Sequence, residues 1–108
     1  MEELREKKCK SCSGEEEPLK GNEIEEFLGR VKEGWNVVEN KKIRKVFSFE
    51  NFKRGMAFAQ NIASVAEKEQ HHPDLCIHYK SVEVELTTHA IDGLSENDFI
   101  MAAKIDEL

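Results

Sequence analysis

Two adjacent histidines precede a proline near the middle of this sequence. The 108-residue chain has four histidines, and His71 and His72 stand directly before Pro73, while His89 follows later in the chain. Imidazole has an unperturbed pKa of about 6.5, so it can donate and accept protons near neutral pH. Three histidines around an open position also suit catalytic zinc. The pattern therefore indicates a proton-transfer site, a metal site or a polar turn without function.

The elements around these histidines are expected to bring them together. A residue before proline disfavours the α conformation, so the preceding helix should stop before His72. Residues 75–79 and 82–87 alternate between apolar and polar types, which is typical of two strands. If these strands pair as a hairpin, the start of the first lies beside the end of the second. We therefore expect His71, His72 and His89 at one edge of a sheet.

The local geometry favours proton transfer over a metal. Neighbouring residues in an extended segment point to opposite sides, so His71 and His72 would have difficulty in binding one ion together. His78 would lie at the hairpin turn, at the opposite end of the strands, and is expected to be a bystander. Cys76 faces the same way as His78 and could act as a nucleophile, but a small packed residue is the simpler interpretation.

The apolar pattern of the chain predicts an α+β fold in the order α-β-β-α-β-β-α. The first helix is expected to begin after Asn22, with Glu25 as its capping partner, and to end at Gly34. Ser95 is expected to cap the last helix, with Asp98 at its third position. The remaining elements are two strands over residues 35–39 and 43–49, joined by a tight turn, and a long helix over about residues 51–70. Two hairpins in a mainly antiparallel sheet, with helices on one face, accommodate this order.

The long helix carries an apolar surface that is broad for so small a protein. The simplest interpretation is a central core helix, and contact with a partner subunit is the alternative. The apolar stripe comprises Phe52, Met56, Ala59, Ala63 and Ala66, widened by Phe58, Ile62 and Val65.

Composition and charge argue against a nucleic-acid-binding protein and a membrane-spanning protein. The formal net charge of −6 argues against a broad electrostatic attraction to nucleic acid. No apolar run approaches the ~20 residues of a membrane span, and the start of the chain lacks a signal-peptide core, so cytoplasmic location is expected. Residues 1–21 are rich in charge and lack apolar periodicity. They are predicted to be a poorly ordered leader before a single domain over residues 22–108.

Cys9 and Cys12 form a CxxC pair in this leader. A structural zinc site usually needs four protein ligands, and the sequence contains no second CxxC pair. Redox pairs usually open a helix beside a strand, which does not fit a polar leader. Incidental thiols are therefore favoured, and a metal protein that uses these cysteines or the histidines is a third alternative.

Beyond the histidines, the sequence resembles the pterin-4a-carbinolamine dehydratase family over roughly residues 9–106. The histidine motifs and their spacing carry most of this resemblance. The similar positions are Glu67, His71-His72-Pro73, Thr87-Thr88-His89, Gly93-Leu94-Ser95, Gly34-Trp35, Phe47, Phe49-Glu50-Asn51-Phe52, Asp98-Phe99-Ile100, Cys9, Cys12 and Pro18-Leu19.

The resemblance implies a subunit with a four-stranded antiparallel sheet and three helices. It implies dehydration of 4a-hydroxytetrahydropterin to the quinonoid dihydropterin, in tetrahydrobiopterin-type recycling, with no metal or organic cofactor. It further implies a homodimer or homotetramer, with contacts through the long helix and the sheet edge. In animals, a family member is also a dimerisation cofactor for a homeodomain transcription factor. The alternative function is a non-catalytic protein-interaction module on the same scaffold.

The resemblance also implies roles for individual residues. The catalytic residues would be His71, His72 and His89: His71 and His89 would transfer protons, and His72 would bind or position the pterin and assist them. Glu67 stands four residues before His71, one helical turn away, and would orient that ring. The other residues expected to bind substrate are Pro73, Thr88, Ala90, Ile91 and Trp35. At Gln70 and Ala90, some relatives carry acidic residues instead.

Overall fold

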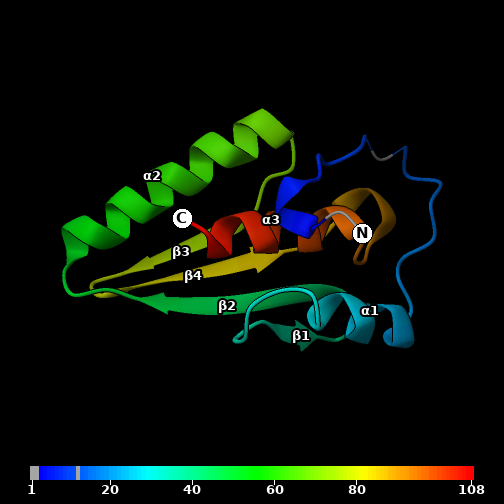
Figure 1. Cartoon of the computed structure of the whole chain (residues 1–108), viewed down its shortest axis with the longest axis horizontal. Helices are drawn as coiled ribbons and strands as arrows, with labels where there is room; N and C mark the ends of the chain where they lie inside the picture. Colours follow the sequence, from blue (N-terminus) through cyan, green and yellow to red (C-terminus); the bar gives the residue numbers. More distant parts are fainter. Residues whose placement is uncertain (1–2, 12) are drawn as a thin grey trace.

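The computed structural model describes residues 3–11 and 13–108. Their strands form one antiparallel sheet in the order β1-β2-β4-β3, in which the two hairpins meet through β2 and β4. Helices α2 and α3 cover one face of this sheet. Helix α1 lies beside them, near the edge of the sheet formed by β1 (Figure 1). The predicted α+β fold and its element order are confirmed. The bounds are α1 Gly21–Leu28, β1 Asn36–Val38, β2 Lys42–Ser48, α2 Phe52–Glu69, β3 Asp74–His78, β4 Ser81–Leu86 and α3 Glu96–Asp106.

The alternation in β4 determines which face of the sheet receives the helices. Val82, Val84 and Leu86 are completely buried, whereas Ser81 and Glu83 on the other face are only partly covered. Helix α3 fills the space above β4, and nearly every one of its side chains is buried. Burial of each large aliphatic or aromatic side chain stabilises the fold by about 1.5–3 kcal/mol.

The first helix differs in its limits from the prediction. It begins one residue before Asn22, with Lys20 as its N-cap, and the Lys20 amide donates to the Glu23 carboxylate at 2.9 Å. This carboxylate sits at the third helical position, where it can reach back to the cap. The helix ends at Leu28 and does not extend to Gly34, since the chain turns after Gly29.

The residues described in the N-terminal segment lie against the rest of the fold. Leu4, in the short 3-10 helix η1 (Leu4–Glu6), is 2% exposed and belongs to the core beside α3. Lys10 and Asn97 exchange two hydrogen bonds, of 2.9 and 2.7 Å. Leu19 donates its amide to the Leu94 carbonyl at 2.9 Å. Contacts with α3 and the turn before it therefore hold this segment in place.

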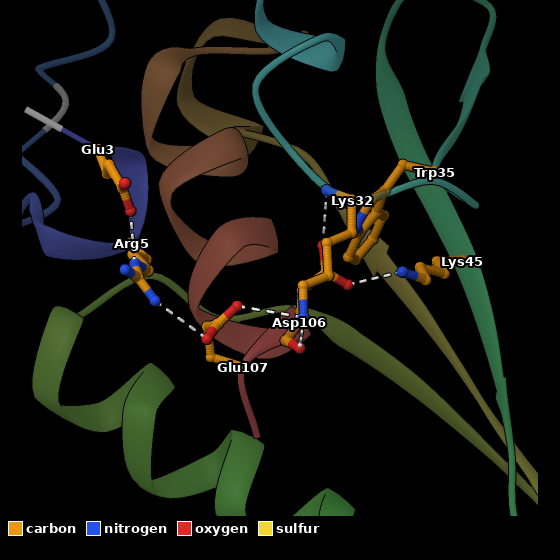
Figure 2. A network of polar contacts seen from close by, with 7 residues as sticks. All are labelled: Glu3, Arg5, Lys32, Trp35, Lys45, Asp106 and Glu107. Carbon is orange, nitrogen blue, oxygen red and sulfur yellow. Dashed lines mark hydrogen bonds and ion pairs between the residues drawn. The ribbon is translucent and has the colours of Figure 1, made fainter. Parts of the chain in front are cut away.

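Trp35 joins the first hairpin to the end of α3 (Figure 2). Its indole Nε1–H donates to Asp106 Oδ2 at 3.0 Å, and Lys45 donates to the other carboxylate oxygen at 2.7 Å. The ammonium of Lys45 also lies 5.7 Å from the centroid of the Trp35 ring. Trp35 is buried, and so is the Asp106 carboxylate. The lone tryptophan therefore has a structural position at the base of β1.

Part of the apolar surface of α2 stays uncovered. Its buried side is centred on Phe58, Ile62 and Ala66, whereas Phe52 is 47% exposed and Ala63 faces solvent. Strand β3 is exposed along its whole length. Within residues 3–11 and 13–108, none of the helices has the length and apolar character of a membrane span.

Candidate active site

A left-handed turn at the end of α2 sets the direction of the two adjacent histidines. Gln70 has φ 54° and ψ 40°, and the amides of Gln70 and His71 both donate to the Ala66 carbonyl. Pro73 then precedes β3, so the two histidines occupy a short link between helix and strand. As predicted, the helix stops before His72.

His71 is held by a buried carboxylate. Its Nε2–H donates to Asp98 Oδ1 at 2.7 Å, where the imidazole is 12% exposed and the carboxylate is completely buried. The other oxygen, Asp98 Oδ2, accepts hydrogen bonds from the Thr88 hydroxyl at 2.8 Å and the Ser95 amide at 3.0 Å. This network fixes the ring orientation and leaves Nδ1 as the nitrogen that can exchange a proton.

No catalytic role was expected for Asp98, which was predicted only at the third position of the last helix, after the cap Ser95. The structure confirms this cap, because Asp98 accepts the Ser95 amide at the start of α3. A carboxylate has two oxygens, and the cap uses one of them. The second oxygen reaches His71, which comes from a different element, so sequence spacing carried no signal for the contact.

Glu67 contacts His72 and not His71, the ring that it was expected to orient. The distance from Glu67 Oε2 to His72 Nε2 is 2.5 Å, and the two side chains are 72% and 55% exposed. The left-handed conformation of Gln70 explains the difference. It ends the regular helix before His71, so the one-turn relationship with Glu67 does not apply there.

The end of β4 brings His89 to the same region. Thr88 forms an isolated bridge with Gly93, and His89 begins the 3-10 helix η2 (His89–Ile91) between them. A cavity of about 280 Å³ opens between this turn and the end of α2. Its lining residues are Lys10, Ser11, Gln70, His71, His72, Thr87, Thr88, His89, Ala90 and Asn97.

The structure thus brings the three candidate histidines together, with Thr88 and Ala90. Of the other predicted site residues, Glu67, Pro73 and Ile91 adjoin the cavity without lining it. Trp35 lies apart from it, bonded to Asp106.

Lys10, Ser11 and Asn97 line the cavity but were not expected there. The N-terminal segment has no apolar periodicity that could have indicated its position. At the cavity, this segment contacts α3 through the hydrogen bonds between Lys10 and Asn97, which are far apart in the sequence.

A larger hollow, of about 490 Å³, lies around the end of α3. Charged side chains line most of it, with Leu4, Val31 and Ala103 between them, and it contains no histidine among the described residues. Its three carboxylates, Glu3, Asp106 and Glu107, are all engaged in ion pairs (Figure 2). This hollow offers no proton-transfer group comparable to the histidines.

The environment of Cys9 does not favour a reactive thiol. Burial, followed by the negative charge of Glu69, raises the pKa of Cys9 to about 12. A protonated thiol is neither a good nucleophile nor a metal ligand. Cys12, the second member of the predicted CxxC pair, lies outside the described residues.

Comparison with known proteins agrees with the motif resemblance. Residues 17–108 match the family described as pterin 4 alpha carbinolamine dehydratase. A relative from Nitrosospira multiformis is 49% identical over 108 residues, which cover 100% of this chain and 94% of that protein. One from Nitrosomonas eutropha is 47% identical over 106 residues, covering 98% and 93%. Both are named after pterin-4-alpha-carbinolamine dehydratase.

Solved structures share the fold. A Brucella melitensis protein described as a transcriptional coactivator/pterin dehydratase is 34% identical, with a TM-score of 0.78 over 83% of this chain and 96% of that one. A pterin dehydratase-like RuBisCO assembly factor of the alpha-carboxysome is 21% identical, with a TM-score of 0.59 over 68% and 87%, and is similar in fold alone. The family match and the full-length relatives show that this chain belongs to the pterin-4a-carbinolamine dehydratase family.

Proposed function

We propose that this protein dehydrates 4a-hydroxytetrahydropterin to the quinonoid dihydropterin, as a step in the recycling of a tetrahydrobiopterin-type cofactor. The observation that carries the proposal is the cavity where His71, His72 and His89 meet, in a chain of this family. The proposed reaction needs no metal or organic cofactor, since imidazoles can supply both proton transfers.

The chemistry needs one base and one acid. The hydroxyl group of the substrate leaves a ring carbon that is bonded to a ring N–H group. Removal of the N–H proton and protonation of the departing hydroxyl release water and leave a C=N bond. His71 and His89 are the proposed proton-transfer pair, and each positioned group typically contributes about 10²–10⁴-fold to such a rate.

The buried carboxylate of Asp98 gives His71 a distinct role. When His71 takes up a proton at Nδ1, the ring becomes positively charged beside Asp98. An oriented carboxylate stabilises this charge without having to rearrange during the reaction. Thr88 would act through Asp98, because its hydroxyl donates to that carboxylate. This role replaces the direct contact between the Thr88 side chain and the pterin that the resemblance implied.

His72 and the turn after β4 are proposed to position the substrate. His72 is the more exposed member of the histidine pair and is held by Glu67. Ala90 lines the cavity on the other side, where backbone groups of residues 88–91 can meet the edge of the flat pterin ring. These contacts would orient the ring between His71 and His89.

The direct test is stopped-flow measurement of 4a-hydroxytetrahydropterin dehydration by the purified protein. We expect the rate to exceed that in buffer and to survive treatment with a chelator. A rate equal to that of buffer would rule out the proposed activity. Loss of activity in chelator with recovery on addition of metal would rule out the cofactor-free mechanism.

We further propose that the subunit forms a homodimer or homotetramer through α2 and the β3 edge. The exposed Phe52 and the partly exposed Leu75 and Ile77 supply apolar contact area. Strand β3 is at the end of the sheet and has free backbone groups for pairing with a second strand. Sedimentation of a stable monomer at micromolar concentration would contradict this assembly.

The same surfaces would serve the alternative function, a non-catalytic interaction module. Two structural neighbours are described as a transcriptional coactivator/pterin dehydratase and as a RuBisCO assembly factor. Absence of dehydratase activity together with a stable protein partner would favour this alternative. The cavity lined by His71, His72 and His89 favours the dehydratase over this alternative, because an interaction module would not need these side chains.

A further inference from the structure

A second group of ligand-type side chains lies on the outer face of the β3–β4 hairpin. Cys76 and His78 alternate along β3 with apolar residues, so both project from the sheet face opposite the helices. Glu83 lies directly across from Cys76 on β4. The sulfur, an imidazole nitrogen and a carboxylate oxygen all lie within 4.8 Å of one another. Cys76 was expected to be packed, but it is exposed.

The spacing of the sulfur and the imidazole fits a tetrahedral ion. Cys76 Sγ is 3.5 Å from His78 Nε2. Zinc binds thiolate at about 2.3 Å and imidazole at about 2.0–2.1 Å, so a tetrahedral angle separates the two ligand atoms by about 3.5 Å. A hydrogen bond between thiol and imidazole accounts for this contact in the absence of metal. The same spacing lets an ion replace the thiol proton without movement of the strand.

Glu83 can supply the third ligand. Arg44 Nε lies 3.5 Å from Glu83, but the shorter contacts of Arg44, 2.7 and 2.8 Å, are to Glu85. Arg44 is therefore bound mainly to Glu85, and a long, partly exposed ion pair holds Glu83 only weakly. A small rotation of the Glu83 side chain would bring its carboxylate to an ion beside Cys76.

The donor set determines the class of ion. A thiolate and a carboxylate together carry two negative charges, which balance a divalent cation. Thiolate and imidazole favour zinc and similar transition metals, whereas calcium and magnesium prefer oxygen ligands. Three protein ligands leave a fourth position for water.

We propose that Cys76, His78 and Glu83 form a zinc-binding site that links β3 to β4 on the outer face of the sheet. None of the three lines the histidine cavity, so this site is separate from the proposed dehydratase. Because the ion binds only when the two strands are paired, it stabilises the hairpin by an amount that grows with the logarithm of its concentration relative to the dissociation constant. The edge strand would then be held by metal as well as by backbone hydrogen bonds.

Titration of the reduced, metal-free full-length protein with Co²⁺ tests the proposal. Thiolate bound to cobalt gives a near-ultraviolet charge-transfer absorption, which binding to histidines alone does not give. We expect this absorption to saturate at one ion per chain and to disappear in Cys76→Ser. The matched control is the double variant Cys9→Ser/Cys12→Ser, which should retain it. Absence of the band in the unmodified chain, or its loss in the control alone, would overturn the proposal.

Competition with a chromophoric chelator then measures zinc affinity. Changes in residues that merely support a metal ligand already weaken binding by about 10–100-fold. We therefore expect at least that loss for His78→Ala and a smaller loss for Glu83→Gln. Zinc should raise the midpoint of thermal unfolding in the unmodified chain and in His89→Ala, but not in Cys76→Ser. Loss of binding in His89→Ala with full binding in Cys76→Ser would place the ion in the histidine cavity and overturn the proposal.

Discussion

The His71 imidazole and the Asp98 carboxylate are hydrogen-bonded at 2.7 Å, although the two residues are 27 positions apart in the sequence. His71 follows α2, and Asp98 lies in the first turn of α3. The contact therefore joins the ends of two helices at the proposed reaction site. The carboxylate has no exposure to solvent, so its charge acts on His71 without being screened by bulk water.

Asp98→Asn is expected to lower the kcat of dehydration at least about tenfold with a smaller change in KM, because the amide no longer stabilises the positive charge on His71. Stopped-flow kinetics measure both constants. The change also weakens the hydrogen bonds around the cap of α3, because an amide keeps only one of the two acceptor oxygens of the carboxylate. Asn51→Ala is the matched control: it removes the cap of α2, where Asn51 accepts the Arg54 amide at 2.9 Å, but leaves the cavity unchanged. An equal loss of kcat in both variants would show that Asp98 acts through stability alone.

His71→Ala and His89→Ala are each expected to cut the rate at least about tenfold, since each removes one proton-transfer group. Circular dichroism should show that the fold survives, because both side chains line a cavity. His78→Ala removes an imidazole from the hairpin turn and should leave kcat unchanged. Full activity in either cavity variant would contradict the assigned roles.

Leu4→Ala is expected to destabilise the protein by about 2–5 kcal/mol, because it leaves a void between η1 and α3. Denaturant unfolding measures the change. The exposed Val46→Ala on β2, outside the proposed subunit contact, is the control and should change the stability by much less. A small effect of Leu4→Ala would mean that the N-terminal segment contributes little to the fold in solution.

The buried thiol of Cys9 predicts a stability change at alkaline pH. Its folded pKa is raised from 9.0 to about 12, so the unfolded chain releases this proton first as the pH rises. The folded state then binds more protons than the unfolded state, and the free energy of unfolding decreases between about pH 9 and 12. Denaturant unfolding at pH 8 and pH 10.5 should show a smaller decrease in Cys9→Ser than in the unmodified chain. Equal decreases in the two proteins would contradict the prediction.

Much of the fold was predictable because its core residues follow simple periods. Alternation in β4 indicated which of its faces is buried, and the sequence from Ser95 to Asp98 indicated the start of α3. The hairpin argument also placed His71 and His89 at one sheet edge, since it needs only strand order. These inferences depend on residues that are close together in the sequence or on the direction of a strand.

The features that the sequence did not predict depend on contacts between residues that are far apart in the chain. The second oxygen of Asp98, the docking of Lys10 against Asn97 and the bond from Trp35 to Asp106 have no periodic signal. The expected orienting role of Glu67 failed for a local reason. Gln70 alone adopts the left-handed conformation at the end of α2, and this changes the direction of the chain at His71 and His72.

Gln70 also has a consequence for any attempt to make this protein more robust. A non-glycine residue in the left-handed conformation costs about 1–2 kcal/mol, which glycine would avoid. Its side chain offsets part of that cost by donating to the Glu67 carbonyl at 2.6 Å. Replacement by glycine would remove the backbone strain at position 70. It would also make the link between α2 and β3, which directs His71 and His72 toward the cavity, more flexible. A gain in backbone stability at position 70 would thus come where added freedom would harm the proposed catalysis, so selection for thermal resistance and selection for turnover would favour different residues there.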